Sequence, residues 1–333
     1  MTEVKFEIFR GVNHEGTPHY DKFTLDIPET TPILTALLKI RDGVDPTLTM
    51  RYSCRQAICG SCAMKVNGKS RLVCSSLVGP EVKTYGKIRI DPPGNMPIMR
   101  DLVTDFSPFW ERYLKVDPFL IDDPAHPTPK GQVSKMSPEQ VEQFRETPRC
   151  IACGACYSGC PSVGEDPEYL GPMALAKAYR FVVDPRDHAY HQRLLKLQDK
   201  GLWLCLRCSL CIEACPKEVR PADRITDLKR LANQEIGPKE SGSRHSVMFV
   251  SNIEDGGLLN EFKLARQSLG FLSLFGQLGK GFQMMRHGKS FMHHPIIHDL
   301  DSLRAIYVEL NKSEDLKHRE RPAGKGVKGE APA

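Results

Sequence analysis

Residues 150–161 read CIACGACYSGCP, and residues 205–216 read CLRCSLCIEACP. Both segments carry four cysteines at the spacing C-x2-C-x2-C-x3-C, and a proline follows the fourth cysteine in each. A third group lies upstream, where residues 54–62 read CRQAICGSC and Cys74 follows. All twelve cysteines of the chain belong to these three groups of four. Thiols that are grouped in this way are more often metal ligands than disulfide partners.

The spacings indicate iron–sulfur sites. The two repeated runs have the bacterial two-cluster spacing, and C-x4-C-x2-C…C is the plant-type [2Fe–2S] spacing. Two residues between ligands allow a tight loop to turn several thiolates towards one cluster. Pro161 and Pro216 then redirect the chain, so that the fourth thiolate of each run points to the neighbouring cluster. Small loop residues such as Gly60, Gly154 and Ser209 let the backbone come that close.

Other thiol chemistries fit this pattern less well. Structural zinc usually takes two separated Cys-x2-Cys pairs for one Cys₄ site, and a thioredoxin-like redox pair would not need eight such cysteines. A zinc-stabilised interaction protein is therefore the alternative of a different class, and metal content with a visible spectrum separates the two. The one Gly-x-Gly-x-x-Gly stretch, residues 324–329, lies in the Lys- and Gly-rich tail and follows no predicted strand, so we expect the chain to bind no flavin or nicotinamide itself.

Length and composition limit the possible classes of protein. The 333 residues suffice for two or three domains, and 40% apolar with 26% charged residues excludes a polytopic membrane protein and a mainly disordered one. A net charge of +5 gives no support to nucleic-acid binding. Residues 1–9 have no apolar core, so we expect no signal peptide or twin-arginine leader and a cytoplasmic, reducing location.

Three regions differ in their hydrophobic periodicity. Residues 1–105 are β-rich, because residues 4–9 and 20–27 alternate at period two. Residues 31–39 predict a short helix across such a sheet, with Ile33, Ala36, Leu37 and Ile40 on one face. Asn67-Gly68 predicts a hairpin between residues 63–66 and 69–73.

The second and third regions have other patterns. Residues 106–240 are helical, with segments around 138–145, 172–182 and 220–234, and the Pro-rich residues 122–129 form a surface excursion. Residues 241–333 are a C-terminal extension, at first amphipathic and then, from Lys317, a disordered tail rich in Lys, Gly, Pro and Glu.

Several motifs resemble one family specifically. Residues 51–62 (RYSCRQAICGSC), 66–69 (VNGK) and 100–105 (RDLVTD) resemble the iron–sulfur subunit of succinate dehydrogenase and fumarate reductase, as do the two Cys-Pro runs. The resemblance covers about residues 1–240. It implies an α+β protein, with an N-terminal β-grasp plant-type ferredoxin domain and then an α-helical bacterial-type two-cluster ferredoxin domain.

The resemblance also implies a function. Electrons pass between FAD in a partner flavoprotein, where succinate and fumarate react, and a quinone near the third cluster at a membrane-anchor partner. This chain would lie peripherally on the cytoplasmic side of the membrane and carry no catalytic residue. On the family's pattern, three cysteine sets hold clusters: Cys54, Cys59, Cys62 and Cys74 hold [2Fe–2S]; Cys150, Cys153, Cys156 and Cys215 hold [4Fe–4S]; Cys160, Cys205 and Cys211 hold the third cluster, [3Fe–4S] in most relatives.

Two departures from the family's pattern matter. Most relatives have no cysteine at the place of Cys208. Many have a Trp shortly after the first Cys-Pro and a His directly after the cysteine equivalent to Cys205, where this chain has residues 162–165 (SVGE) and Leu206. The chain thus resembles the less common members, whose membrane partner is of the heterodisulfide-reductase type. The alternative function is a relay in a heterodisulfide-reductase-like or other flavin dehydrogenase complex.

Cys208 bears on the identity of the third cluster. Its spacing duplicates the 150–156 run, so we predict that it supplies the fourth ligand and that the third cluster is [4Fe–4S]. The alternative is a free thiol beside a three-iron cluster, since free cysteine behaves as a small apolar residue.

Residues 256–298 form a basic amphipathic segment. Five Lys and Arg residues stand against one acid, Glu261. Such a segment either lies on an anionic membrane surface or a partner helix, or closes the core of the ferredoxin domain. Its apolar residues recur at helical spacing: Leu258, Phe262, Ala265, Leu269 and Leu272.

Overall fold

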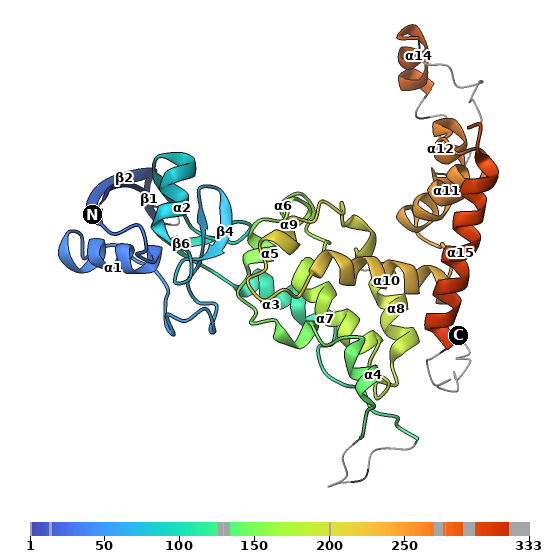
Figure 1. Cartoon of the computed structure of the whole chain (residues 1–333), viewed down its shortest axis with the longest axis horizontal. Helices are drawn as coiled ribbons and strands as arrows, with labels where there is room; N and C mark the ends of the chain where they lie inside the picture. Colours follow the sequence, from blue (N-terminus) through green and yellow to red (C-terminus); the bar gives the residue numbers. More distant parts are fainter. Residues whose placement is uncertain are drawn as a thin grey trace. The chain divides into compact units, whose positions relative to one another are not determined.

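The computed structural model describes residues 2–12, 15–125, 129, 134–199, 201–269, 276, 278–288 and 297–319. The chain divides into two compact units, Met1–Leu228 and Lys229–Ala333. The division falls within helix α10, Pro221–Glu235. Figure 1 follows the chain from the blue strands of the first unit to the red helix α15 of the second.

The first unit begins with a mixed sheet. Among the described residues it has seven strands: β1 (Thr2–Val12), β2 (Glu15–Ile27), β3 (Ala63–Val66), β4 (Lys69–Leu72), β5 (Ile88–Asp91), β6 (Ile98–Arg100) and β7 (Val103–Thr104). Strand β1 pairs antiparallel with β2 and parallel with β5, and the β3–β4 hairpin extends the sheet beyond β5. Asn67 and Gly68 turn this hairpin with φ of 48° and 80°, as a type I′ turn requires. The predicted hairpin is confirmed.

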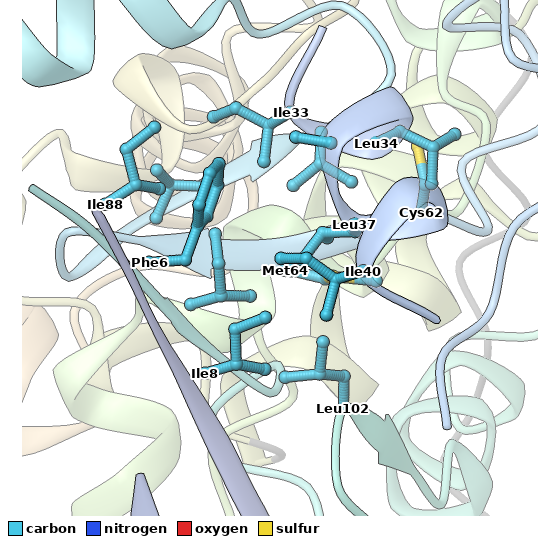
Figure 2. Close-up of a cluster of buried hydrophobic side chains, with 14 of the residues drawn as sticks. Phe6, Ile8, Ile33, Leu34, Leu37, Ile40, Cys62, Met64, Ile88 and Leu102 are labelled. Atoms are coloured by element: carbon cyan, nitrogen blue, oxygen red, sulfur yellow. The ribbon is translucent and has the colours of Figure 1, made fainter. Parts of the chain in front are cut away.

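A helix packed on the sheet forms the core of this region. Val4, Phe6 and Ile8 alternate with charged residues along β1 and are at most 1% exposed. Helix α1, Ile33–Gly43, buries the apolar face that its periodicity predicts, and helix α2, Val78–Tyr85, follows the hairpin. Figure 2 shows Leu37 and Ile40 of α1 in one cluster with Phe6 and Ile8 of β1. Each such buried side chain contributes about 1.5–3 kcal/mol, and the helix across the sheet confirms the β-grasp expectation.

The rest of the first unit is helical. Helix α7 buries residues on all sides, among them Met173, Leu175, Tyr179 and Phe181, so it lies at the centre of this region. The predicted segment 172–182 coincides with α7, whereas the predicted segment 138–145 is helical only to Glu142. The helical elements are α3 (Ser107–Leu114), α4 (Pro138–Glu142), η1 (Thr147–Arg149), α5 (Ala155–Ser158), α6 (Pro161–Glu165), α7 (Pro172–Val182), α8 (Tyr190–Asp199), η2 (Leu202–Leu204), α9 (Leu210–Glu213) and α10.

The second unit contains α11 (Ser241–Gly256), α12 (Glu261–Leu269), α14 (Leu278–Arg286) and α15 (Leu300–Arg319). Helix α11 packs on α12 and α15. The Arg304 guanidinium ties α15 to the end of α11, donating to the carbonyls of Glu254 at 3.4 Å and Asp255 at 3.3 Å. Because α15 continues to Arg319, the prediction of a disordered tail is wrong for residues 317–319. Residues 320–333 lie outside the described residues.

The predicted apolar stripe of α12 is not its buried face. Leu258, which precedes α12, and Phe262 are 45% and 49% exposed, whereas Leu264 and Ser268 are buried. The buried side is therefore set by contact with α11 and not by the strongest apolar periodicity. The side chain of Leu269, and Leu272, lie outside the described residues.

Within the first unit, two cysteine loops touch. A Cβ atom added at Gly60 would lie 2.7 Å from the Cβ atom of Cys153, so only glycine fits there. Gly60 also has φ of +78°, which a residue with a Cβ atom adopts at a cost. The backbone of the first cysteine group is therefore in direct contact with the second group.

Hydrogen bonds beside the cysteine loops also join the sheet region to the helical region. The Ser70 hydroxyl of β4 donates to the Ser158 hydroxyl of α5 at 3.0 Å. The Asn95 amide donates to the carbonyls of Tyr157 and Cys160, both at 2.8 Å. These hydrogen bonds thus satisfy backbone carbonyls at the end of α5, between Cys156 and Cys160.

We predict that Gly60→Ala destabilises the first unit more than Gly68→Ala does. Both glycines have φ near 80°, but a Cβ atom at Gly68 meets nothing within 4 Å. In the control variant, Gly68→Ala, only the left-handed backbone conformation lowers the free energy of unfolding, by about 1–2 kcal/mol. This lowers Tm by roughly 2–8 °C. Gly60→Ala should lower Tm by at least twice as much, because the Cys153 loop has to move. Equal Tm values for the two variants would contradict the close packing.

Candidate metal centres

The first cysteine group surrounds its thiols with backbone N–H groups. The amides of Gln56, Ile58 and Cys59 donate to Cys54 Sγ at 3.4, 3.4 and 3.3 Å. The amide of Ala57 donates to Cys74 Sγ at 3.2 Å. Successive N–H groups that converge in this way form a nest for anions, as at many iron–sulfur sites.

The loop is held in an uncommon backbone conformation. Arg55, Ala57 and Gly60 have φ of 59°, 55° and 78°. Non-glycine residues reach this region at a cost of order 1–3 kcal/mol and do so mainly at functional sites. Here the residues of positive φ alternate with residues of negative φ, which turns the N–H groups inward to the sulfur atoms.

The thiols of this group differ in acidity. The Ser61 hydroxyl, followed by the Cys54 amide, lowers the pKa of Cys59 to about 6. Burial raises the pKa of Cys62 to about 12. Because iron binds thiolates, loading this site releases the proton of the buried thiol.

The second cysteine group lines a cavity of its own. Cys150, Cys153, Cys156 and Cys215 face this cavity together with Met173. Burial raises the pKa of Cys153 to about 11 and also raises the pKa of Cys150 and Cys156. The first three thiols come from one run and the fourth from the other run. This is the set that the family resemblance predicts for [4Fe–4S].

The third group lines a second cavity. Cys160, Cys205, Cys208 and Cys211 all face it, with Tyr169 beside them. Burial, with the neighbouring thiols of Cys205 and Cys160 next in effect, raises the pKa of Cys211 to about 12. The structure thus brings together all four residues of the predicted third site, Cys208 included.

The two repeated runs fold alike. Ala152 and Gly154 have φ of 52° and 76°, and the corresponding Arg207 and Ser209 have φ of 56° and 63°. A short 3-10 helix, η1 or η2, precedes each loop, and a short α-helix, α5 or α9, follows it. Cys208 therefore occupies in its loop the position that Cys153 occupies in the other.

Proline ends each run as the spacing predicts. Pro161 is the first residue of α6, so the chain leaves Cys160 in a new direction. Cys160 therefore lines the cavity of the third cysteine group. Cys215, of the other run, lines the cavity of the second group. The amide of Val219 donates to Cys215 Sγ at 3.4 Å.

Four thiols line each of the two cavities of the helical region. The backbone amide of Val219 is directed at the sulfur of Cys215. Sulfur ligands around a space of this kind match the donor set of iron–sulfur clusters.

Sequence reasoning missed other residues that line the cavities. Met173 faces the cavity of the second cysteine group, and Tyr169 and Leu210 face that of the third. None of them belongs to a cysteine motif, and Tyr169 lies eight residues after Pro161. Only the packing of α6 and α7 brings Tyr169 to the thiols, so no local pattern could have identified it.

Comparison with known proteins agrees with this geometry. Residues 5–111 match the family model of the 2Fe-2S iron-sulfur cluster binding domain, and residues 146–219 match that of the 4Fe-4S dicluster domain. None of the helices in the described ranges has the length and hydropathy that a bilayer crossing requires.

Curated relatives cover both domains. The fumarate reductase iron-sulfur subunit of Haemophilus influenzae is 41% identical over 223 residues, which are 64% of this chain and 86% of the relative. The succinate dehydrogenase iron-sulfur subunit of Paracoccus denitrificans is 37% identical over 70% of this chain and 89% of its own length. A chain of the Mycobacterium smegmatis Sdh1 complex in the apo form superposes with a TM-score of 0.61 and 25% identity, covering 70% of this chain and 96% of that chain. This chain belongs to the family of iron–sulfur subunits of succinate dehydrogenase and fumarate reductase.

Proposed function

We propose that this chain conducts electrons between FAD in a flavoprotein subunit and a quinone at a membrane subunit of a succinate:quinone oxidoreductase. Clusters at its three sites supply one-electron oxidation and reduction when bound. The chain's own residues hold these sites in order and limit their exposure to water. We assign no substrate chemistry to them.

The contiguity of the three thiol groups is the observation that carries this proposal. Gly60 of the first group packs on Cys153 of the second. Helix α5 contains Cys156 of the second cysteine group and leads directly to Cys160 of the third group. The thiol groups therefore form an unbroken series through the first unit.

Both ends of the series carry exposed apolar side chains. At one end, Ile58 is 59% exposed beside the exposed Cys59. At the other end, Leu206 and Leu210 are 68% and 43% exposed around Cys208. Apolar side chains of this kind suit protein interfaces. We assign the loop 53–62 to the flavoprotein contact, and Leu206 with Leu210 to the membrane partner.

The exit end supports a membrane partner of the heterodisulfide-reductase type. Leu206, directly after Cys205, lines the cavity of the third cysteine group. Unlike the histidine that many family members have here, it has no imidazole that could bind a quinone. Ser162 follows Pro161 along the same cavity, where many family members have a Trp nearby. The same observation favours the second candidate function, a relay in a heterodisulfide-reductase-like complex, which differs only in the partner.

We propose that the third cluster is [4Fe–4S], held by Cys160, Cys205, Cys208 and Cys211. Cys208 lines the same cavity as the other three, and its loop repeats the backbone of the loop around Cys153. A four-iron cluster generally has a lower potential than the three-iron form, which suits a low-potential quinone such as menaquinone.

We also propose that helix α14 lies on an anionic membrane surface. Phe282 and Met285 of α14 are 63% and 53% exposed and lie three positions apart, on one face of the helix. The sequence has no acid between Glu261 and Asp299 but five Lys and Arg residues. Exposed apolar residues within a basic segment are the features of an interfacial helix.

The first prediction tests the relay. In the assembled complex, Cys59→Ala should abolish electron transfer from succinate to quinone, because it removes a ligand at the entrance of the series. Reduction of the flavin by succinate should continue, which serves as the internal control. Stopped-flow absorbance of flavin and quinone measures both steps. Normal quinone reduction in this variant would refute the proposed order.

The second prediction tests the third cluster. Cys208→Ser should convert it to a three-iron cluster, because one corner of the cube then lacks a thiolate. Low-temperature EPR of the oxidised protein should show a strong three-iron signal only in this variant, whereas Cys153→Ser, at the equivalent position of the first run, should alter the other cluster. A three-iron signal of equal size in the unaltered protein and in Cys208→Ser would make Cys208 a bystander.

The third prediction tests helix α14. Phe282→Ser should weaken binding of the full cluster-loaded chain to phosphatidylglycerol vesicles about ten-fold or more, since burial of this ring is worth about 1.5–3 kcal/mol. Val308→Ser, at a 51% exposed apolar position of α15, is the matched control and should leave binding unchanged. Co-sedimentation measures both. Loss of clusters in Phe282→Ser would instead indicate that the segment supports the core.

A further inference from the structure

Tyr169 is a buried polar residue at the third cysteine group. Its side chain is 1% exposed and lines the cavity with Cys160, Cys205, Cys208 and Cys211. It lies between α6 and α7, just before Gly171, whose φ of 89° begins the turn into α7. A fully buried hydroxyl needs a hydrogen-bond partner, and its cost without one is about 1–3 kcal/mol.

The partner of this hydroxyl is the thiol of Cys205. Both side chains line the same cavity, and the hydroxyl donates this hydrogen bond to Cys205 Sγ. A phenol oxygen with a proton is the donor in such a pair, and a thiolate sulfur is the acceptor.

Tyr169 differs in kind from the other donors in this cavity. Backbone amides of Ser162 and Val163 direct hydrogen bonds to Cys160, and the amide of Ala222 directs one to Cys211. Those amides belong to the backbone, and only proline, which also restricts the backbone, would remove them. The hydroxyl of Tyr169 can be removed alone, and the aromatic ring that fills the core can remain.

We propose that Tyr169 raises the reduction potential of the third cluster by donating an O–H···S hydrogen bond to Cys205. Reduction adds one electron and hence one negative charge to the site. A donor to a ligand sulfur stabilises that charge, and hydrogen bonds to sulfur are among the determinants of cluster potentials. This inference rests on the proposed third cluster site. Tyr169 is a positioning residue, since it acts through Cys205.

The test is a redox titration of the assembled complex, monitored by EPR. Tyr169→Phe should make reduction of the third cluster about ten-fold less favourable, which is a downward shift of about 59 mV for one electron. The potentials of the other two clusters and the iron content should stay unchanged. Tyr179→Phe is the matched control, because its buried hydroxyl bonds to the Gln143 carbonyl at 3.2 Å and should leave the potential unchanged.

A second variant keeps the shape of the side chain entirely. 3,5-Difluorotyrosine at position 169 is a stronger hydrogen-bond donor, so it should shift the same potential upwards. An unchanged potential in both variants, with the cluster present, would refute the role of Tyr169. The unaltered complex separates this result from failure of the proposed function, because its EPR signals show whether the three clusters are there at all.

Discussion

Gly60 has no side chain, and the loop around it can therefore pack directly on the Cβ atom of Cys153. Every other feature of the first unit is consistent with this contact. The sheet presents the first cysteine loop at one of its ends, and the hydrogen bonds of Ser70 and Asn95 hold the beginning of the helical region against it. No side chain of the first loop therefore separates Gly60 from Cys153.

Burial of the thiols connects folding with cofactor binding. In the two cavities of the helical region, burial raises the pKa of Cys153 to about 11 and of Cys211 to about 12. Such thiols stay protonated at neutral pH without metal, and the thiolate form requires the positive charge of iron. Cluster insertion therefore supplies free energy to the folded state of the helical region.

The two ends of the series differ in their surroundings. At the entrance, hydrogen bonds from backbone amides and from Ser61 surround thiols that lie close to the surface. At the exit, the thiols are joined by the exposed Leu206 and the buried Tyr169. The thiols of the first group are thus held mainly by backbone donors, whereas those of the third group have a side-chain hydroxyl beside them.

The sequence alone determined the features that depend on short-range spacing. The cysteine loops, the Asn67-Gly68 hairpin and the crossing helix α1 follow from residues less than about ten positions apart, because turn geometry and helical periodicity are local. The sequence could also place Cys208 beside Cys205 and Cys211, since all three belong to one repeated run.

Tertiary structure decided what depends on distant segments. The contact of Gly60 with Cys153, the placement of Tyr169 at Cys205 and the buried side of α12 each join residues that no motif relates. In each case the free energy of packing one element on another exceeds the local preference, and only the folded chain shows which elements meet.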